Sequence, residues 1–516
     1  MAMTDTSDHG VAETAYDAIH CKISAINLGY FEDPFAKLFE KKATRRIPLI
    51  HRGYYLRHVA VEHAVHLFLQ NRTPGRSAQI VSLGAGFDTL FFRLTQQEQH
   101  ADLRMFEVDC TAITRQKIDV LQANTAALFG PASETTQTGT TFAATVPELN
   151  ASYAALSCDL GDLDSLKAQL ASQGLDYTHP TLFLAECVLA YLTPEASTAI
   201  LGWTSSAFSD SMVVTYDPVG LNKDGFGQQM HRYFEAKGCT LRSALLKSSI
   251  PDYTTFLTTV GWLSIRLHDM NAIYNALVDG NERQRIASLE PFDEFEDWKL
   301  TNHHYAVLVA TNRTLDATGS ATAAAVAAWP TTTALSGIIH AYSLPTSNGV
   351  LRVRPFQESD LLGVRSLFES VHGELIQASK SVRKLAAKAL ETDLADVNHY
   401  YLRPGTAAGF WVATDQDNSL VGIVGLKPLG DDGELCRLAV DPKMRKCRVA
   451  TRLVDELERY GAAVGFDRIT LETLDQMHDA QAFYAARGYV VVSSNRVGKP
   501  PDEIVLDRLE KRVKTC

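Results

Sequence analysis

A glycine-rich turn and a carboxylate further along the chain could together hold a nucleoside. Gly84-Ala85-Gly86 directly follows the apolar run 79–83 and precedes a stretch that can be helical. Glycines at such a turn let a ligand approach the backbone closely, and the helix after it offers unpaired N–H groups. Asp109 ends the next apolar run, 103–108, at the spacing of about 20 residues where a carboxylate binds the two hydroxyls of a ribose. The alternative for Asp109 is a solvated charge at a strand end.

Glu186 is the second carboxylate placed for chemistry. It directly follows the apolar run 181–185, and the carboxyl end of a strand is where an α/β sheet binds its ligand. Arg57 lies on a stretch predicted to be helical, 54–69, and taken alone it would be an ordinary solvated charge. Cys158 and Cys187 sit inside apolar runs, which favours small buried side chains over catalytic thiols.

The segments that must position these residues alternate between short apolar runs and longer amphipathic stretches. This alternation predicts an α/β fold with a doubly wound, Rossmann-like, mostly parallel sheet whose ligands bind at the carboxyl ends of the strands. The expected strands are 79–83, 103–108, 155–158, 181–185 and 212–216.

Between Thr311 and Val350 the residues become small and hydroxylated, with almost no charge. Such a stretch cannot build a core, although its Ala-rich part can form a short helix. We therefore expect a linker at 314–348 between a first domain, 1–313, and a second domain, 349–511. In the second domain the order of elements predicts a mixed α/β unit, with strands near 351–355, 410–413, 420–426, 435–440 and 469–471.

The overall composition is that of a folded chain. Hydrophobic residues make up 46% and charged residues 21% of the 516 residues, which are ordinary globular values. A net charge of -11 disfavours a protein that coats nucleic acid non-specifically, since that needs surplus Lys and Arg, but it allows a local basic cleft. The eight cysteines form no Cys-x-x-Cys pair, which favours a reducing compartment and predicts no zinc or other metal site. With no apolar run of about 18 residues and no signal-peptide pattern at the start, we expect a cytoplasmic protein without a membrane partner.

Several long motifs resemble the leucine carboxyl methyltransferase family, over roughly residues 14–313. The resemblance implies a class I methyltransferase domain with S-adenosylmethionine as its cofactor. A carboxylic acid is already ionised at neutral pH, so its methylation needs no general base and no proton-transfer residue is expected in this domain. The motifs are Arg46-Ile-Pro-Leu-Ile-His-Arg-Gly-Tyr-Tyr55, Ser82-Leu-Gly-Ala-Gly-Phe-Asp-Thr-Leu-Phe-Phe-Arg93, Phe106-Glu-Val-Asp109, Ala185-Glu-Cys-Val-Leu-Ala-Tyr-Leu-Thr-Pro-Glu195 and Phe226-Gly-Gln228.

The same resemblance implies a set of cofactor contacts and a substrate end. Cations suit the methionine carboxylate, Asp109 the ribose, Asp159 the adenine amine, and Glu186 the ammonium or sulfonium end. The implied cofactor-binding residues are Lys22, Arg57, Gly84, Gly86, Asp109, Asp159, Leu160 and Glu186. The candidates for orienting the substrate carboxylate are Arg52, Tyr54 and Tyr55.

The family has two branches that differ in substrate. One methylates the C-terminal leucine of the protein phosphatase 2A catalytic subunit, and the other acts late in wybutosine synthesis on phenylalanine tRNA. Leu49-Ile-His-Arg-Gly-Tyr-Tyr55 and Leu289-Glu-Pro-Phe-Asp-Glu-Phe-Glu-Asp-Trp298 are more similar to the tRNA branch, whereas Cys21-Lys22 and Gly29-Tyr-Phe-Glu-Asp-Pro34 are similar to the phosphatase branch. Relatives would have Tyr-Glu-Gln where this chain has Tyr216-Asp217-Pro218, so substrate specificity stays open if that segment touches substrate.

Residues 350 to about 510 resemble the GNAT acetyltransferases, through Glu434-Leu-Cys-Arg-Leu-Ala-Val440, Asp441-Pro-Lys-Met-Arg-Lys-Cys-Arg-Val-Ala450 and Ala480-Gln-Ala-Phe-Tyr-Ala-Ala-Arg-Gly-Tyr489. The resemblance implies acetyl-CoA bound by Leu438, Val440, Arg445, Arg448 and Ala450, with Arg448 standing where the family's loop has glycine. An arginine there can obstruct the pyrophosphate or bind it.

Two catalytic roles follow from this second resemblance. Tyr484 is implied as the acid that protonates the leaving thiolate, and Glu434 as the base, directly or through water, for an unidentified amine acceptor. The alternative for Tyr484 is a packed aromatic side chain. The alternative for the whole domain is an inactive CoA-binding or docking module.

Overall fold

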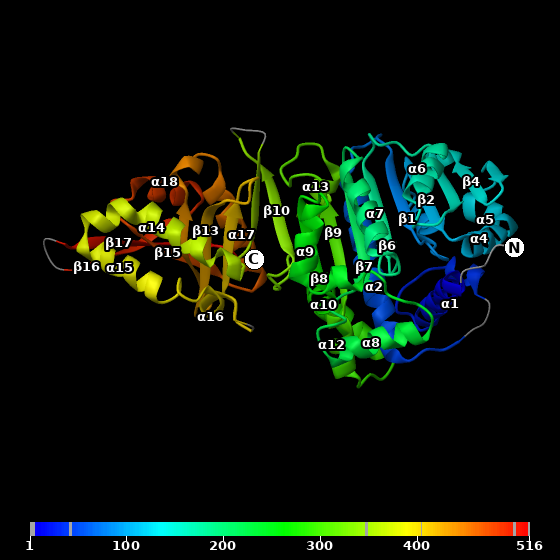
Figure 1. The fold of residues 1–516 in the computed structure, drawn as a ribbon, viewed down its shortest axis with the longest axis horizontal. Coiled ribbons are helices and arrows are strands. Elements are labelled where there is room, and N and C mark those ends of the chain that lie inside the picture. The colour runs from blue at the N-terminus through cyan, green and yellow to red at the C-terminus, as the bar shows by residue number, and fades with distance from the viewer. Residues whose placement is uncertain (1–5, 41–43, 346–348, 404, 499–501, 514–516) are drawn as a thin grey trace. The chain divides into compact units, whose positions relative to one another are not determined.

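The computed structural model describes residues 6–40, 44–345, 349–403, 405–498 and 502–513. The chain divides into two compact units, Met1–Pro330 and Thr331–Cys516, each of which has its own sheet and is described by itself (Figure 1).

The first unit is built on a twisted sheet whose centre is parallel. Strands β5, β2, β1, β6 and β7 run parallel in that order. On one side β4 and β3 continue the sheet as an antiparallel hairpin, and on the other side β9 and then β8 pair antiparallel. The strands are β1 Ala78–Leu83, β2 Leu103–Asp109, β3 Thr135–Thr138, β4 Thr141–Val146, β5 Ala151–Ser157, β6 Thr181–Glu186, β7 Ser211–Pro218, β8 Ser264–Asp269 and β9 Tyr305–Thr311.

The continuous apolar runs of the sequence form the middle of this sheet. Every residue of β1 and of β7 is buried, as expected for parallel strands covered on both faces. The prediction of a doubly wound α/β fold is therefore confirmed. Each of the five expected strands is present, and β5 begins at Ala151, earlier than expected.

The helices of the first unit begin at residues that cap or favour a helix start. Helix α2 has Pro48 at its first position, and Thr193, Asp224 and Ser249 accept N–H bonds from the first turns of α7, α8 and α9. The helices are α1 Thr6–Asn27, α2 Pro48–Gln70, α3 Leu90–Phe92, α4 Thr111–Ala123, α5 Thr125–Phe129, α6 Leu163–Ser172, α7 Pro194–Ser206, α8 Gly225–Ala236, α9 Ile250–Thr259, α10 Met270–Leu277, α11 Gly280–Leu289, α12 Phe295–His303 and α13 Ala321–Ala328, with the short turns η1 Ala36–Phe39, η2 Arg93–Gln97, η3 Pro147–Leu149 and η4 Ala244–Lys247.

Residues 314–348 hold more structure than the expected linker. Helix α13 packs against α2 and β9 with most of its side chains buried, and Asp210 accepts bonds from the Ser320 hydroxyl (2.6 Å) and the Ala321 N–H (3.0 Å) at its start. Strand β10, Ile338–Ser343, belongs to the second unit and pairs with β11, Val350–Pro355. Small residues contribute little apolar area each, but they allow a helix to approach its neighbours closely, and this is how α13 is held.

The second unit contains a mostly antiparallel sheet with one parallel pair. Its order is β10-β11-β12-β13-β14-β15-β17-β16, and only β14 and β15 run parallel among the strands described. The remaining strands are β12 Gly409–Thr414, β13 Leu420–Leu429, β14 Asp432–Val440, β15 Arg468–Leu474, β16 Val490–Val497 and β17 Ile504–Arg512. The helices are α14 Leu361–Ala378, α15 Lys380–Glu391, α16 Val397–Tyr401, α17 Val449–Ala463 and α18 His478–Ala486, with the turns η5 Glu358–Asp360 and η6 Pro442–Met444.

Strands β14 and β15 part before they end. Their pairing stops at Leu435 and Leu471, although β14 continues to Val440 and β15 to Leu474. Helix α17 packs its apolar side on β12, β13 and β14, and starts just beyond the end of β14. The mixed α/β architecture expected for this region is confirmed.

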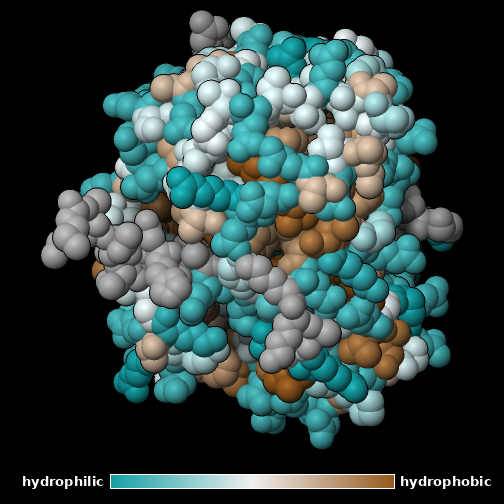
Figure 2. Space-filling view, turned by 90° about the vertical axis from the view of Figure 1, so that its right-hand side faces the viewer, coloured by the Kyte–Doolittle hydropathy of each residue, from teal (hydrophilic) through white to brown (hydrophobic). Residues whose placement is uncertain are grey.

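The face of the molecule drawn in Figure 2 is mostly hydrophilic. In Figure 2 the visible face shows separate apolar patches rather than one continuous band. Within the described residues, no helix combines the length and the apolar character that crossing a membrane requires.

Candidate cofactor and substrate sites

The first site lies where the strand order of the sheet reverses. β1 pairs with β2 on one side and with β6 on the other, so the loops after these strands leave in different directions. Such a reversal opens a crevice at the carboxyl ends of the strands. Gly84 follows β1, Asp109 ends β2 and Glu186 ends β6, so the fold brings these three predicted residues to one edge of the sheet.

The glycine turn and Asp109 are fixed to each other. Gly84 and Gly86 have φ of +61° and +55°, in the left-handed region that favours glycine, and a Cβ on Gly84 would come within 2.4 Å of Val188. The N–H groups of Gly86 and Cys110 each donate to the Asp109 carboxylate at 2.7 Å. Burial raises the pKa of Asp109, while these two bonds favour its charged form. A carboxylate has further lone pairs, so Asp109 can still accept two ribose hydroxyls.

A small cavity lies beside this turn, lined by Ala85, Gly86, Glu107, Asp109, Thr114, Lys117 and Ala155. Its floor is a buried ion pair between Lys117 and Glu107. Lys117 also donates to the backbone carbonyl of Asp88 at 2.8 Å, and the Tyr153 hydroxyl donates to Glu107. These contacts hold the turn after β1 against β2.

Arg57 and Glu186 form an ion pair at the end of β6. Arg57 Nε lies 2.6 Å from Glu186 Oε2, and the guanidinium packs 5.1 Å from the Tyr216 ring and 5.7 Å from the Tyr54 ring. Although burial opposes it, the neighbouring Glu186 carboxylate raises the pKa of Arg57 well above its usual value. Cys187 turns the chain sharply after Glu186, with φ of +57°. The pair presents a cation and an anion side by side.

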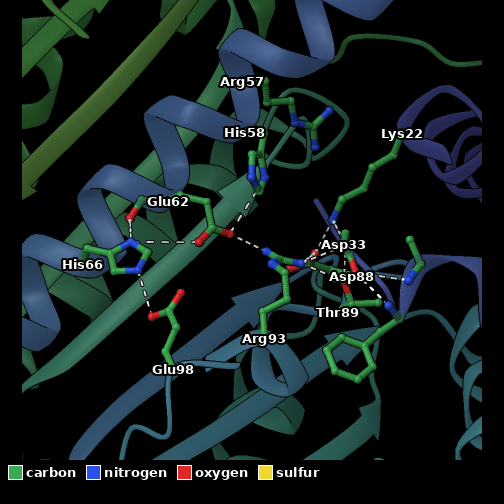
Figure 3. Close-up of polar contacts among 12 residues, drawn as sticks. Lys22, Asp33, Arg57, His58, Glu62, His66, Asp88, Thr89, Arg93 and Glu98 are labelled. Carbon is green, nitrogen blue, oxygen red and sulfur yellow. Dashed lines mark hydrogen bonds and ion pairs between the residues drawn. The ribbon is translucent and has the colours of Figure 1, made fainter. Parts of the chain in front are cut away.

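Lys22 is held by carboxylates. Its Nζ lies 3.0 Å from Asp88 Oδ1 and 3.2 Å from Asp33 Oδ2 (Figure 3). An ammonium has three donors, so at least one is left for a ligand carboxylate. Lys22 was predicted to bind the cofactor. The structure places it beside Asp88, and Asp88 lies two residues after Gly86 in the chain.

Arg93 is the centre of the network that holds Lys22 in place. Its guanidinium donates to Asp33 at 3.0 Å and to the Thr89 hydroxyl at 2.7 Å, and it also pairs with Glu62 of α2 (Figure 3). Arg93 is almost fully buried, so these partners replace its hydration. The network connects α1, α2 and the segment after β1.

Asp159 and Leu160 follow β5 at the same edge of the sheet. The Gly161 N–H donates to Asp159 Oδ1 at 2.8 Å, which orders the turn, and Asp159 is exposed while Leu160 is buried. An exposed carboxylate beside an apolar side chain suits an adenine, which offers an amino group and a flat apolar face.

The three candidates for substrate binding have different surroundings. Tyr54 lies beside Arg57. The Arg52 guanidinium packs 4.0 Å over the Phe292 ring, and the Tyr55 hydroxyl donates to Glu282 at 2.8 Å. Arg52 and Tyr55 thus contact the segment of α11 and α12, and both also contact Tyr30. Of the three candidates, only Tyr54 packs on Arg57 among the described contacts.

The segment 216–218, where the family resemblance implied Tyr-Glu-Gln, is buried. Asp217 pairs with Lys247 at 2.9 Å, and both side chains are almost fully enclosed. Burial raises the pKa of Asp217, while Lys247 opposes this shift. The preceding residue, Tyr216, stacks on Tyr305 with ring centroids 5.0 Å apart and supports Arg57.

The second site lies where β14 and β15 part. Leu438 and Val440 are on the part of β14 that has lost its pairing with β15, and α17 begins nearby. Arg448 is the residue before α17 and has φ of +64°, the left-handed conformation that glycine adopts freely. Arg445 and Arg448 are exposed, and Ala450 lies in the first turn of the helix. A helix start surrounded by cations attracts phosphate.

The two predicted catalytic residues differ in burial. Tyr484 is buried on α18, and burial followed by the charge of Cys436 raises the pKa of its hydroxyl. Glu434 is half-buried on β14, opposite Lys427 of β13 in the register. Cys436 lies between these parts of the site, with its Sγ 3.3 Å from the Tyr401 hydroxyl.

One buried charged cluster in this unit was not predicted. Asp393 accepts two bonds of 2.9 Å from Arg437 and one of 2.9 Å from Lys427, and the Tyr401 hydroxyl also donates to it. Despite burial, Arg437 holds the pKa of Asp393 below its usual range. The signal in the sequence was a charged residue, Arg437, within the otherwise apolar run 435–440.

Two family models match the chain, one in each unit. The model described as leucine carboxyl methyltransferase matches residues 10–205, and the model of the acetyltransferase (GNAT) family matches residues 379–489. The second match falls inside the segment in which its resemblance was inferred, and the first overlaps its segment from residue 14 onward.

Named relatives match the first unit. Human tRNA wybutosine-synthesizing protein 4 is 38% identical over 287 residues, which are 55% of this chain and 41% of that protein. The leucine carboxyl methyltransferase 1 homolog of Arabidopsis thaliana is 35% identical over 315 residues, 60% of this chain and 92% of the relative. Among solved structures, a GNAT family acetyltransferase from Staphylococcus aureus covers 32% of this chain and 99% of its own length, with 19% identity and a TM-score of 0.27.

Proposed function

The chain belongs to the leucine carboxyl methyltransferase family, and we propose that its first unit transfers a methyl group from S-adenosylmethionine to a carboxylate oxygen. The observation that carries this proposal is the Arg57–Glu186 ion pair at the end of β6. An amino acid end carries one carboxylate and one ammonium, and the pair supplies a partner for each.

The rest of the cofactor would be bound along the same edge of the sheet. We assign the ribose hydroxyls to Asp109, at the end of β2, and the adenine to Asp159 and Leu160, which follow β5. The left-handed Gly84 and Gly86 support this placement, because a ligand can approach their backbone without meeting a Cβ. Lys22 adds a cation near the same turn.

The chemistry needs position more than proton transfer. A carboxylate is ionised at neutral pH, so the protein must hold one of its oxygens in line with the methyl group and exclude water from it. A wall beside Glu186 is formed by the Arg57 guanidinium and the rings of Tyr54 and Tyr216. This wall can position the carboxylate oxygen and exclude water from it. Tyr54 is therefore our first choice among the three substrate candidates.

For the substrate, we propose the carboxylate of a wybutosine precursor on phenylalanine tRNA. The support is the match to human tRNA wybutosine-synthesizing protein 4 and the motifs at 49–55 and 289–298. The alternative substrate is the C-terminal leucine of the phosphatase 2A catalytic subunit. It is supported by the leucine carboxyl methyltransferase 1 relatives, of which the Arabidopsis thaliana homolog is matched over 92% of its length.

The test is incubation with labelled S-adenosylmethionine and either substrate. We expect label in hypomodified phenylalanine tRNA, in a form released by mild base as an ester. Glu186→Gln should lower cofactor affinity, because it removes the charge that partners the ammonium, whereas Glu195→Gln, at an exposed position of α7, should not. Label in the phosphatase subunit alone would select the alternative substrate, and label in neither would contradict the proposal.

We further propose that the second unit transfers an acyl group from acetyl-CoA to an amine. The support is the exposed start of α17, where Arg445 supplies a cation, and the buried hydroxyl of Tyr484. In this transfer a C–N bond forms as the C–S bond breaks, and the leaving thiolate needs a proton. Because its pKa is raised, Tyr484 stays protonated at neutral pH and can donate one.

Tyr484→Phe tests this role. The change keeps the ring packing and removes only the hydroxyl, so acyl turnover should fall by about 10² to 10⁴ with little effect on CoA affinity. Tyr489→Phe is the matched control, because that ring lies 5.6 Å away and its hydroxyl donates to Glu458 instead. CoA binding without turnover in the parent protein would favour an inactive CoA-binding module.

A further inference from the structure

Three metal-ligating side chains converge on the surface of the first unit, away from the residues assigned above. His66 Nε2 lies 2.9 Å from Glu98 Oε2, and His100 Nε2 lies 3.0 Å from the same oxygen. The three ligand atoms all lie within 4.8 Å of one another. The side chains are 21% to 32% exposed, so an ion can reach them from solvent.

The fold fixes these three residues from two sides. His66 is on α2, and Glu98 and His100 follow η2. Gln99 between them has φ of +54°, which turns the chain so that its two neighbours point to the same place. The N–H groups of Glu98 and His100 donate back to Arg93 (3.2 Å) and Leu94 (2.9 Å), so the turn is anchored to the end of η2.

The hydrogen bonding of His66 determines which of its nitrogens is free. Nδ1 lies 2.7 Å from the backbone carbonyl of Glu62, and because a carbonyl only accepts, Nδ1 carries the proton. In the neutral imidazole Nε2 then has a lone pair, and it faces a carboxylate that also only accepts. Two acceptors at 2.9 Å need a cation between or beside them, which is either a proton or a metal ion.

We propose that His66, Glu98 and His100 bind a zinc ion, with water in the remaining position. Two imidazoles and a carboxylate are an established donor set for Zn²⁺, and tetrahedral bonds of about 2.0 to 2.2 Å place neighbouring ligand atoms about 3.3 to 3.6 Å apart. The two contacts to Glu98, at 2.9 and 3.0 Å, would lengthen by a few tenths of an ångström around such an ion, and all three ligand atoms already lie within 4.8 Å of one another. A backbone carbonyl on the far nitrogen of His66 is the second contact that orients a metal-bound histidine.

The bound ion would link α2 to the residues that follow η2. Glu62, one turn before His66, pairs with Arg93, which in turn holds Asp33 (Figure 3). By holding His66, zinc would therefore stabilise the charged network of Glu62, Arg93 and Asp33, which extends to Lys22. It would add stability to the first unit and would take no part in group transfer.

The experiment uses the full chain without an affinity tag, stripped of metal and titrated with ZnCl₂ by calorimetry. We expect one ion per chain, and His66→Ala or His100→Ala should each weaken binding at least about tenfold. Glu98→Gln, a surface change of nearly the same shape, should also weaken it. The matched control is His303→Ala, because His303 is an exposed histidine paired with a single carboxylate, Asp269, at 3.1 Å.

A second measurement separates a zinc site from a folding effect. Zinc should raise the thermal unfolding temperature of the parent protein and of His303→Ala, but not that of Glu98→Gln, and Co²⁺ should give visible absorption bands only in the first two. No zinc binding by the parent protein would overturn the proposal and leave a proton between the side chains. Equal binding by the parent protein and the His66→Ala, His100→Ala and Glu98→Gln variants would overturn it as well.

Discussion

At the scale of single residues, Asp109 connects the glycine turn after β1 to the end of β2. It accepts the N–H groups of Gly86 and Cys110 and, in our proposal, the ribose of the cofactor. Asp109→Asn should weaken S-adenosylmethionine binding by about 1 to 3 kcal/mol, the range for losing hydrogen bonds to a charged group. Calorimetric titration of the folded variant measures this loss.

The control for Asp109→Asn is Asp164→Asn on α6, where the carboxylate is almost fully exposed. That variant should bind the cofactor as the parent protein does. Unchanged affinity in Asp109→Asn would show that the ribose is bound elsewhere.

Arg448 is strained by its backbone conformation. A residue with a Cβ in the left-handed region destabilises the fold by roughly 1 to 2 kcal/mol. Glycine would remove this strain, but it loses more chain entropy on folding, so only part of that free energy would be recovered. Arg448→Gly should therefore stabilise the second unit by about 0.5 to 1 kcal/mol, measured by scanning calorimetry. Affinity for CoA should be equal or higher, because the loop loses a crowding side chain.

Arg445→Gly provides the comparison within the same loop. Arg445 has φ of -62° and ψ of 148°, an extended conformation that any residue adopts, so glycine there should bring no stabilisation. A large loss of CoA affinity in Arg448→Gly, but not in Arg445→Gly, would identify Arg448 as a phosphate ligand.

Residues at the ends of strands could be predicted from the sequence, and residues that meet across the fold could not. Gly84, Asp109 and Glu186 were found because each follows an apolar run, and the topology then brings strand ends to one edge. The cationic partners of Asp393 are 34 and 44 residues away, and His66 and Glu98 are separated by 32. Such pairs are created by packing, and no local pattern marks them.

At the scale of elements, Arg93 connects three segments of the first unit. Arg93→Met would leave Glu62 buried without its arginine partner and Asp33 with Lys22 as its remaining cation, and breaking a buried ion pair typically costs about 3 to 5 kcal/mol. We expect a clear fall in the denaturant midpoint of the first unit. Arg115→Met on the exposed side of α4 should change stability by less than about 0.5 kcal/mol.

The same network makes a prediction about pH. Although burial opposes it, Lys22 and then Arg93 hold the pKa of Asp33 below its usual range. A carboxyl with a lowered folded-state pKa contributes stability above its unfolded pKa of about 3.9, and this contribution is lost as pH falls through the folded-state value. The stability difference between the parent protein and Asp33→Asn should therefore be full at neutral pH and shrink only below about pH 4. A difference that stays constant down to pH 2 would contradict the role of Asp33.

Elements with strong apolar patterns were predicted well, whereas for small and polar residues the hairpin of β3 and β4 was not predicted and α13 was expected only as a short helix within a linker. The five expected strands of the first unit are present, and most of them are runs of large apolar side chains. The hairpin of β3 and β4 consists mainly of Thr and Ala, and α13 is mainly Ala. Their stability comes from close approach to neighbours, which the hydrophobic pattern does not record.

At the scale of the whole molecule, the division into two units predicts where a protease cuts first. Residues 331–337 lie between α13 and β10 without regular structure, and Thr333 and Ser336 are exposed there. Elastase should cleave in this segment and leave two stable fragments, as mass spectrometry would show. The expected linker was longer, 314–348, but α13 and β10 occupy much of it.

Helix α13 supplies the internal control for this cleavage. Its Ala-rich sequence is as suitable for elastase as 331–337, but most of its side chains are buried. It should be cut only after unfolding of the first unit. Early cleavage inside α13 or β10 would place the boundary elsewhere.

The left-handed Arg448 also bears on how this chain can change. Every arginine codon differs from a glycine codon by a single base, so one point mutation can replace the strained arginine with glycine. Most natural proteins have such stabilising substitutions within reach, because selection removes only those variants that fall below the stability they need. A library of random point mutants selected for heat resistance should therefore return glycine at this position early, without any knowledge of the loop.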